Sequence, residues 1–545
     1  MTTTTQTIEL EALSHTTILT PIISKKSLEI ANNATTAEDG PSTPYAPSAS
    51  TLKITLTIFQ PSLVNFVSSF ATAIITVGLP VIARDIDLPR SLYLWPSSVF
   101  GLTSGAMLLI AGAITDIVGA RIVEQIGILF LGVFTLACGL STTGVQLVVF
   151  RALQGIAMAM HLPASVALIA GTVPSGRSRN VGFACLGLSQ TLGFAFGLVL
   201  SGIMIQRSGW RSGFYLCGGA NLLAAVASLW LLPKVNPGSE SDRTKLQRIL
   251  DEIDWVGGII SGGGLAILAY VLAILSADLS TIRSADTISL LSVSIVLLVA
   301  FPIWMHYRER AAKPALVPNS LWKNLPFAST CIMVVLSYGV VNSMELFSSL
   351  YFQEVQNATT LTTSLQLLPS LVVGTVLNLG MGLFIHRISV RWLVTVSSFL
   401  CALAPLMMAL VDPAWQYWYL EFWAQVFAPM SVDVLFTIGL IIVSENFPEK
   451  TQALAGAVFS TVSQFGLSLG VGSCQVVALG VMGKNEGTEG GDGVGHSAAF
   501  EGMDAVAILR GYRASFWTMF AYMILCGLIA VVGLRKAGKI GLKRE

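Results

Sequence analysis

Apolar and polar positions alternate along the chain in long blocks. After a polar first section, apolar runs long enough to cross a bilayer recur fourteen times, since a membrane-spanning helix needs about 20 mostly apolar residues. The runs begin near Ile54, Leu92, Ile122, Val145, Asn180, Phe214, Val256, Thr287, Pro326, Ser364, Arg391, Gln416, Gln452 and Tyr512. The pattern predicts an all-α membrane protein with fourteen transmembrane helices and both ends of the chain on one side.

The composition agrees with this class and excludes others. The chain is 53% apolar and 11% charged, against roughly 25% charged residues in a soluble domain. Its 31 basic and 30 acidic residues nearly cancel, so it lacks the basic surface of a nucleic-acid-binding protein. The seven cysteines lie inside apolar runs with no CxxC pair, which argues against a zinc site or a disulfide framework. We expect no metal and no cofactor.

Basic residues predict the orientation. Of the 31 Lys and Arg, 22 fall in the tails and loops on the side of the N-terminus, 8 on the other side, and one inside a span. Basic loops remain on the cytosolic side, so both termini are expected in the cytosol. Asn357 then begins an N-glycosylation sequon in an outer loop, whereas the sequon at Asn33 lies in the cytosolic tail.

Polar segments predict the domain organisation. Residues 1–53 are rich in Thr, Ser, Ala and Pro and lack the apolar core of a signal peptide. Such a segment cannot bury enough apolar surface to fold alone. The predicted parts are a disordered cytosolic tail at 1–53, a six-helix bundle at 54–233, a cytosolic linker with two extra helices at 234–312, a second six-helix bundle at 313–535 with a Gly-rich outer loop at 483–511, and a cytosolic tail at 536–545.

The inner loop after the second span reads GAITDIVGAR, residues 112–121. Gly112, Asp116 and Gly119 share one helical face. The helix dipole disfavours a carboxylate at a helix C-terminus, so Asp116 is expected to pair with Arg121 or with another helix's N-terminus. The alternative is an ordinary polar turn. The pattern resembles the loop motif of the major facilitator superfamily, which implies a latch on the cytosolic gate.

The fourth span reads VVFRALQGIAMAMHLPAS and contains Arg151, Gln154 and His161. A cation inside a span is costly and usually marks a transport pathway, although Arg can also extend its charge toward the membrane surface. Arg151, Gln154 and Gly155 resemble the RxxQG motif of the same superfamily, which implies a role in proton coupling. His161 is either part of the pathway or a ring bonded to a nearby carbonyl.

The fifth span is rich in glycine, which allows close helix packing. Similar helices mark antiporters of this superfamily, although Leu198 and Ser201 here replace a proline and a glycine of the family pattern. The candidate residues on this helix are Gly187, Gln190, Gly193, Gly197 and Gly202.

In this superfamily the central cavity is lined by the first and fourth helices of each bundle. The ionisable residues singled out inside spans all fall on those helices, and they are Arg151, His161, Glu345 and Asp433. Related antiporters carry an aspartate on the first helix, where this chain has 70–72 Phe-Ala-Thr. Glu345 is therefore expected to carry the proton and Asp433 to act second, with Arg151 modulating them.

Further fragments extend the resemblance, among them LYLWPSSV at 92–99, DWVGG at 254–258 and LYFQEVQ at 350–356. With fourteen spans, the chain resembles the fungal form of the drug:proton antiporter branch. This implies a major facilitator fold arranged 6+2+6, and proton-driven export of small amphipathic compounds, whether drugs, toxins or secondary metabolites. A monomer in the plasma membrane is expected, with the vacuolar membrane as the alternative.

Two other functions remain open. A facilitator or importer of the same fold would need no proton, and the missing aspartate and altered fifth span favour it. A receptor or sensor that does not transport is a different class. An enzyme is disfavoured because the chain has no HExxH, GxSxG or clustered His/Asp set, and an ATP-driven pump because it has no phosphate-binding GxxxxGK[ST] loop.

Overall fold

The computed structural model describes residues 51–89, 92–173, 177–233, 247, 253–277, 279–311, 313, 315–384, 389–447, 449–483 and 505–535. Their regular structure is entirely helical, and fourteen helices are long and apolar enough to cross a membrane. The prediction of an all-α protein with fourteen transmembrane helices is therefore confirmed. Most of the two predicted tails, the charged linker and the Gly-rich loop lie outside the described residues.

The helices fall into three groups along the chain. The first bundle consists of α2 (Thr51–Asp85), α3 (Trp95–Val118), α4 (Ala120–Leu140), α5 (Gly144–Thr172), α6 (Arg177–Ser208) and α7 (Trp210–Leu231). The extra pair is α9 (Trp255–Ala277) and α10 (Ala285–Arg310), with short turns η2 (Leu279–Arg283) between them and η3 (Asn319–Lys323) after them. The second bundle consists of α11 (Leu325–Leu350) with the turn η4 (Tyr351–Val355), α12 (Thr360–Phe384), α13 (Val390–Leu410), α14 (Glu421–Phe427) with α15 (Met430–Asn446), α16 (Glu449–Gly483) and α17 (Ala505–Gly533).

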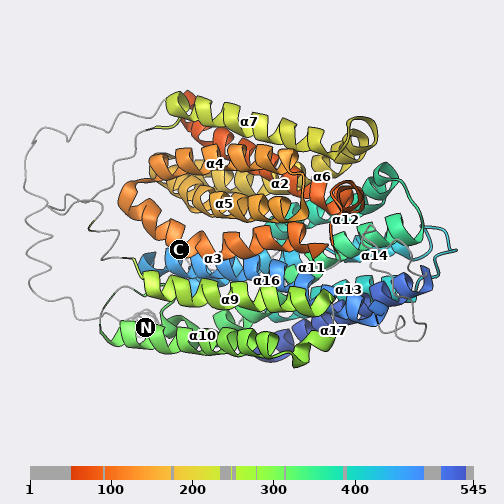
Figure 1. Ribbon diagram of the computed structural model, residues 1–545. Helices are drawn as coiled ribbons and strands as arrows, with labels where there is room; N and C mark the ends of the chain where they lie inside the picture. Colours follow the sequence, from red (N-terminus) through yellow and green to blue (C-terminus); the bar gives the residue numbers. More distant parts are fainter. Residues whose placement is uncertain are drawn as a thin grey trace, which may run out of the picture. The chain divides into compact units, whose positions relative to one another are not determined.

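Both bundles use the same packing scheme. In the first, α2 packs on α6, α3 on α5, and α4 on α7. In the second, α11 packs on α16, α12 on α14 and α15, and α13 on α17. Helices α9 and α10 lie side by side, and α9 also contacts α3 and α16 (Figure 1). The arrangement is the expected 6+2+6, while the residue boundaries of the predicted parts stay a prediction.

Two helices of the second bundle are not regular along their length. Helix α11 continues into η4, which is a single π-helical turn. The span formed by α14 and α15 is broken at Ala428 and Pro429, because proline has no backbone N–H to donate to the preceding turn. Asp433 consequently lies in the first turn of a new helix, where the helix dipole favours a negative charge.

We call the side on which α2 begins and α17 ends the tail side, and the opposite side the far side. Glycines let the bundles approach in the half nearer the far side. A side chain at Gly101 of α3 would meet Leu467 of α16 at 2.8 Å, and one at Gly202 of α6 would meet Leu361 of α12 at 2.9 Å. At Gly202 the close atom belongs to the backbone, so glycine is required there, whereas at Gly101 the Leu467 side chain would have to move aside.

Hydrogen bonds also join the bundles on the far side. Tyr93, in the turn before α3, donates to Glu354 of η4 at 2.5 Å, and Gln353 donates to the Val77 carbonyl of α2 at 3.0 Å. These contacts and the glycine contacts close the far side in this conformation.

Candidate functional site

Arg151 of α5 is fully buried and ties three helices together. Its Nε donates to the Pro96 carbonyl of α3 at 2.9 Å, and its Nη1 donates to Gln154 Oε1 at 2.8 Å. Gln154 in turn donates to Thr135 of α4 at 2.8 Å. The guanidinium also lies 4.6 Å from the centroid of the Phe100 ring. Arg151 and Gln154, which belong to the same sequence motif, are thus hydrogen-bonded one turn apart on a single helix.

The charge of Arg151 is compensated by dipoles. No carboxylate among the described residues lies within ion-pairing distance of it, and Nη2 has no hydrogen-bond partner there. A buried cation without a counter-ion is costly, so the carbonyl, the amide and the aromatic face must hold it in place.

Gly155 is required for this arrangement. A side chain at Gly155 would reach the Phe100 carbonyl of α3 at 2.5 Å, and a backbone atom cannot move aside cheaply. Helices α3 and α5 can therefore approach closely enough for Arg151 to bond to Pro96 only because residue 155 has no Cβ.

His161 lies farther along α5, where its Nδ1 is 3.0 Å from Glu124 Oε1 of α4. Both side chains are fully buried. The remaining polar atoms, His161 Nε2 and Glu124 Oε2, have no hydrogen-bond partner within the described part of the chain. His161 therefore contacts the ionisable side chain of Glu124. The alternative considered above, a bond from the ring to a nearby backbone carbonyl, is not what the structure shows.

Sequence reasoning did not single out Glu124. It is an acidic residue in the apolar run IVEQIGILF, and an ionisable residue within a span is a candidate by default. A search for a counter-charge to His161 would have found it.

The second bundle holds the two predicted carboxylates close together. Asp433 of α15 accepts a hydrogen bond from Asn378 of α12 at 2.9 Å. Glu345 of α11 is near enough to Asp433 for their charges to interact, and so is Tyr338, two turns earlier on α11. Glu345 and Asp433 are partly exposed. They form an acidic centre between α11, α12 and α15.

The four ionisable residues predicted for one cavity thus lie in three separate polar groups, two in the first bundle and one in the second. Arg151 and His161 bond only to first-bundle groups among their described contacts, whereas Asp433 bonds to the second bundle. In this conformation Arg151 does not contact Glu345, so the expected modulation of one by the other is untested.

The loop motif between α3 and α4 departs from expectation at one contact. Arg121 donates to the Leu229 carbonyl at the end of α7, at 2.6 Å, and does not bond to Asp116. Asp116 is exposed and has no hydrogen-bond partner among the described residues. Gly119 has a φ of +108°, which glycine adopts without strain. Gly112 makes only an ordinary contact, with Pro163 at 3.9 Å.

The glycines of α6 have unequal roles. A side chain at Gly193 would overlap the Phe66 backbone of α2, and one at Gly197 would meet Phe70 of α2 at 2.8 Å. Gly202 faces α12 of the other bundle, as described above. Gly187 has open space around its Cα, and Gln190 is exposed, so neither contributes to close packing here.

Other predicted features lie at the edges of the site. Asn357 is exposed on the far side, directly after η4. No group of three or more His, Cys, Asp and Glu that could hold a metal occurs within the described ranges.

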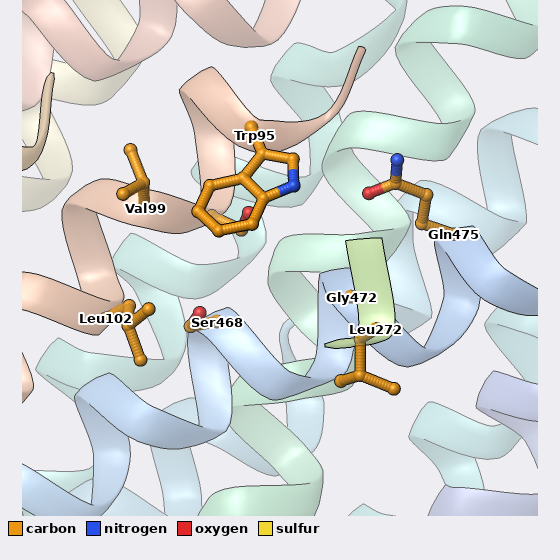
Figure 2. A pocket seen from close by; sticks show the side chains of 8 residues that line it. Trp95, Val99, Leu102, Leu272, Ser468, Gly472 and Gln475 are labelled. Atoms are coloured by element: carbon orange, nitrogen blue, oxygen red, sulfur yellow. The ribbon is translucent and has the colours of Figure 1, made fainter. Parts of the chain in front are cut away.

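One small crevice lies where α3, α9 and α16 meet. Its cavity volume of about 10 Å³ is room for roughly one water molecule. Figure 2 shows Trp95 and Gln475 beside it, from α3 and α16. The residues that line it are Trp95, Ser98, Val99, Leu102, Leu272, Ser468, Gly472 and Gln475. It is too small for an organic solute.

Comparisons with known proteins agree with the fold. Residues 62–471 match the family model of the Major Facilitator Superfamily. The chain is 38% identical over 526 residues to "MFS-type transporter 1" of Pyricularia oryzae, covering 90% of this chain and 85% of that one. It is 23% identical to "Efflux pump terJ" of Aspergillus terreus, covering 80% and 76%.

Among solved structures, it resembles an inward-facing bacterial homolog of the human lysosomal transporter Spinster. The TM-score is 0.61 at 14% identity, covering 88% of this chain and 96% of that one. This likeness shows the fold alone.

Proposed function

Because the chain belongs to the major facilitator superfamily, we propose that it exports small amphipathic organic compounds in exchange for protons by alternating access. The observation that carries this proposal is the acidic centre of Glu345 and Asp433. Two partly exposed carboxylates inside spans are close enough to interact, and intramembrane carboxylates commonly serve as proton carriers. The relative named an efflux pump supports the direction of transport.

Each carboxylate has a separate role in this mechanism. Glu345 exchanges the proton, because no hydrogen bond to it from a described residue fixes its charge. Asp433 is held by Asn378 and by the start of α15, so it contributes to the acceptance of the solute. The closed far side corresponds to the state that loads solute from the cytosol.

A proton-independent facilitator is the second candidate. Phe70 and Ala71 are buried at the position on α2 where related antiporters carry an aspartate, and Arg151 has no carboxylate partner among the described residues. A facilitator would transport without any need for an intramembrane proton carrier.

Vesicle transport distinguishes the two. The wild-type protein in proteoliposomes with an imposed pH gradient should accumulate a lipophilic dye cation against its concentration gradient, whereas Glu345→Gln should equilibrate the dye without accumulating it. Solute counterflow without a pH gradient should persist in Glu345→Gln. Proton-driven accumulation by Glu345→Gln would remove Glu345 from the mechanism, and the absence of proton-driven accumulation by the wild type would favour the facilitator.

The same proposal includes the oligomeric state of the transporter, its membrane and its orientation. The proposed setting is a monomer in the plasma membrane of a fungal cell, with its tail side in the cytosol. The distribution of basic residues supports this orientation. N-glycosylation should then occur at Asn357 and not at Asn33, and mass spectrometry of the protein expressed in yeast would test this orientation.

A further inference from the structure

A carboxylate on the far side is shared by the two bundles. Glu354 lies in η4, and its Oε1 accepts the hydroxyl hydrogen of Tyr93 at 2.5 Å. Its Oε2 accepts the hydroxyl hydrogen of Tyr512, which belongs to α17. Tyr93 is 2% exposed and Tyr512 is 1% exposed. The first bundle supplies one phenol, and the second bundle supplies the other phenol and the carboxylate.

The π-helical turn sets up this contact. Gln353 and Glu354 are consecutive, yet both reach the first bundle, at the Val77 carbonyl and at Tyr93. Single π-helical turns occur frequently at functional sites. The apolar pattern does not predict this turn, because Glu354 lies among polar residues at the end of a span.

The charged and titratable groups around Glu354 come from three elements. Arg84, in the last turn of α2, interacts electrostatically with it, and Tyr93 and Tyr512 supply the hydrogen bonds. The neighbouring ionisable groups have other described partners. Glu421 accepts from Gln356 at 2.6 Å, and Arg513 donates to the Val411 carbonyl.

Protonation changes what this contact can do. An ionised carboxylate only accepts hydrogen bonds, and here both oxygens receive one. A protonated carboxyl group is neutral, so its bonds to the two phenols lose their charge assistance and its attraction to Arg84 is lost. The oxygen that carries the hydrogen can then contact a phenol only as a donor, which weakens the present arrangement. Separation of the bundles breaks the bond to Tyr93 but leaves the bond to Tyr512, which is in the same bundle.

We propose that Glu354 is a proton-binding site formed jointly by the two bundles, and that a proton taken up there releases Tyr93 and opens the far side. This inference rests on the proposed proton antiport, in which the proton enters from the far side. Glu354 would take it up where the bundles meet, before it reaches Glu345. Proton affinity and far-side opening are linked, because the open state loses one of the two phenol donors that stabilise the ionised carboxylate. Hydration of the carboxylate on opening acts in the opposite direction, so the label distances at the two pH values give the sign of the net effect.

The test measures opening directly and needs no substrate. Spin labels are attached at Ser208→Cys and Ala414→Cys, two exposed far-side positions in different bundles, after the native cysteines have been replaced. The distance between the labels is measured in lipid nanodiscs at pH 8 and pH 5. We expect a mainly short distance at pH 8 and a larger population with a long distance at pH 5.

Four variants assign the effect to Glu354. Glu354→Gln should raise the ratio of open to closed protein at pH 8 by roughly tenfold, the loss expected for charge-assisted hydrogen bonds, and should remove the pH response. Tyr93→Phe should also favour opening at pH 8. Tyr512→Phe is the matched control, since it loses a bond to the same carboxylate within one bundle, and it should stay mainly closed. Glu354→Asp keeps a titratable carboxylate and should keep a pH response.

The proposal is overturned if Glu354→Gln retains the wild-type pH response, or if Tyr512→Phe opens the far side as much as Tyr93→Phe. If Glu354→Gln does not fold, the comparison of Tyr93→Phe with Tyr512→Phe decides alone. The vesicle assay distinguishes the two proposals, because it depends on Glu345. If the Glu354 proposal is overturned but proton-driven accumulation in vesicles persists, the antiport proposal is retained.

Discussion

The two bundles share a packing scheme, but Arg151 of the first and Asp433 of the second differ in burial and in the groups that hold them. Arg151 of the first bundle is fully buried and fixed by neutral groups on three helices. Asp433 of the second bundle lies after a helix break, partly exposed, with one amide partner. A charge that is fixed and enclosed supports the structure, whereas a charge that stays accessible can exchange a proton or meet a solute. Under the proposed mechanism, the buried charge of the first bundle serves stability and the accessible charge of the second serves transport.

Removal of the buried cation, Arg151, should have the largest effect on stability. Arg151→Ala leaves Gln154 and the Pro96 carbonyl buried without their donor, which should cost about 3 kcal/mol of stability. Transport should be lost with it. Thermal unfolding of the purified protein measures the first effect, and Arg207→Ala, at an exposed arginine, is the control. An Arg151→Ala protein as stable as the wild type would show that the charge has no structural role.

Substitutions that weaken the contact between His161 and Glu124 should have an intermediate effect on stability. Glu124→Gln keeps a side chain that can bond to His161, so we expect a loss of about 1–2 kcal/mol. His161→Asn should cost a similar amount, and the double variant should cost less than the sum because the two groups are in contact. Additive losses would mean that the two side chains do not stabilise each other.

Asp433→Asn should have the smallest effect on stability. The side chain is partly exposed, and asparagine can still accept from Asn378, so the loss should stay below about 1 kcal/mol. The change should instead appear in transport, as a reduced preference for cationic over neutral solutes in vesicles. A destabilisation as large as that of Arg151→Ala would remove the contrast between the bundles.

The fold could be predicted almost entirely from the sequence, because the bilayer requires each span to be long and apolar. The errors occur at helix ends that contain polar residues, where the helix begins either before or after the predicted residue. The last span was predicted from Tyr512, but α17 begins at Ala505, and the span predicted from Gln416 begins with α14 at Glu421. Local composition cannot show where a helix continues beyond the apolar run.

The site was less predictable, because its contacts depend on how helices pack. Arg151 and Gln154 are one turn apart, so their partnership could be inferred from helical spacing. Arg121 bonds to Leu229, 108 residues away, and Tyr93 bonds to Glu354, 261 residues away. No spacing along the chain indicates such contacts, since they arise only when separate spans come together.

The position of α9 has a consequence for how a lipid-dissolved molecule would reach the interior. Because α9 contacts both α3 and α16, the junction of the bundles on that side is covered by a third helix. The other junction, between α6 and α12, has no such cover among the described helices, and only 17% of the apolar stretch of α6 is buried. The two lateral junctions of the bundles are thus unequal: a third helix separates one of them from the bilayer, whereas a hydrophobic compound diffusing in the bilayer could reach the other directly.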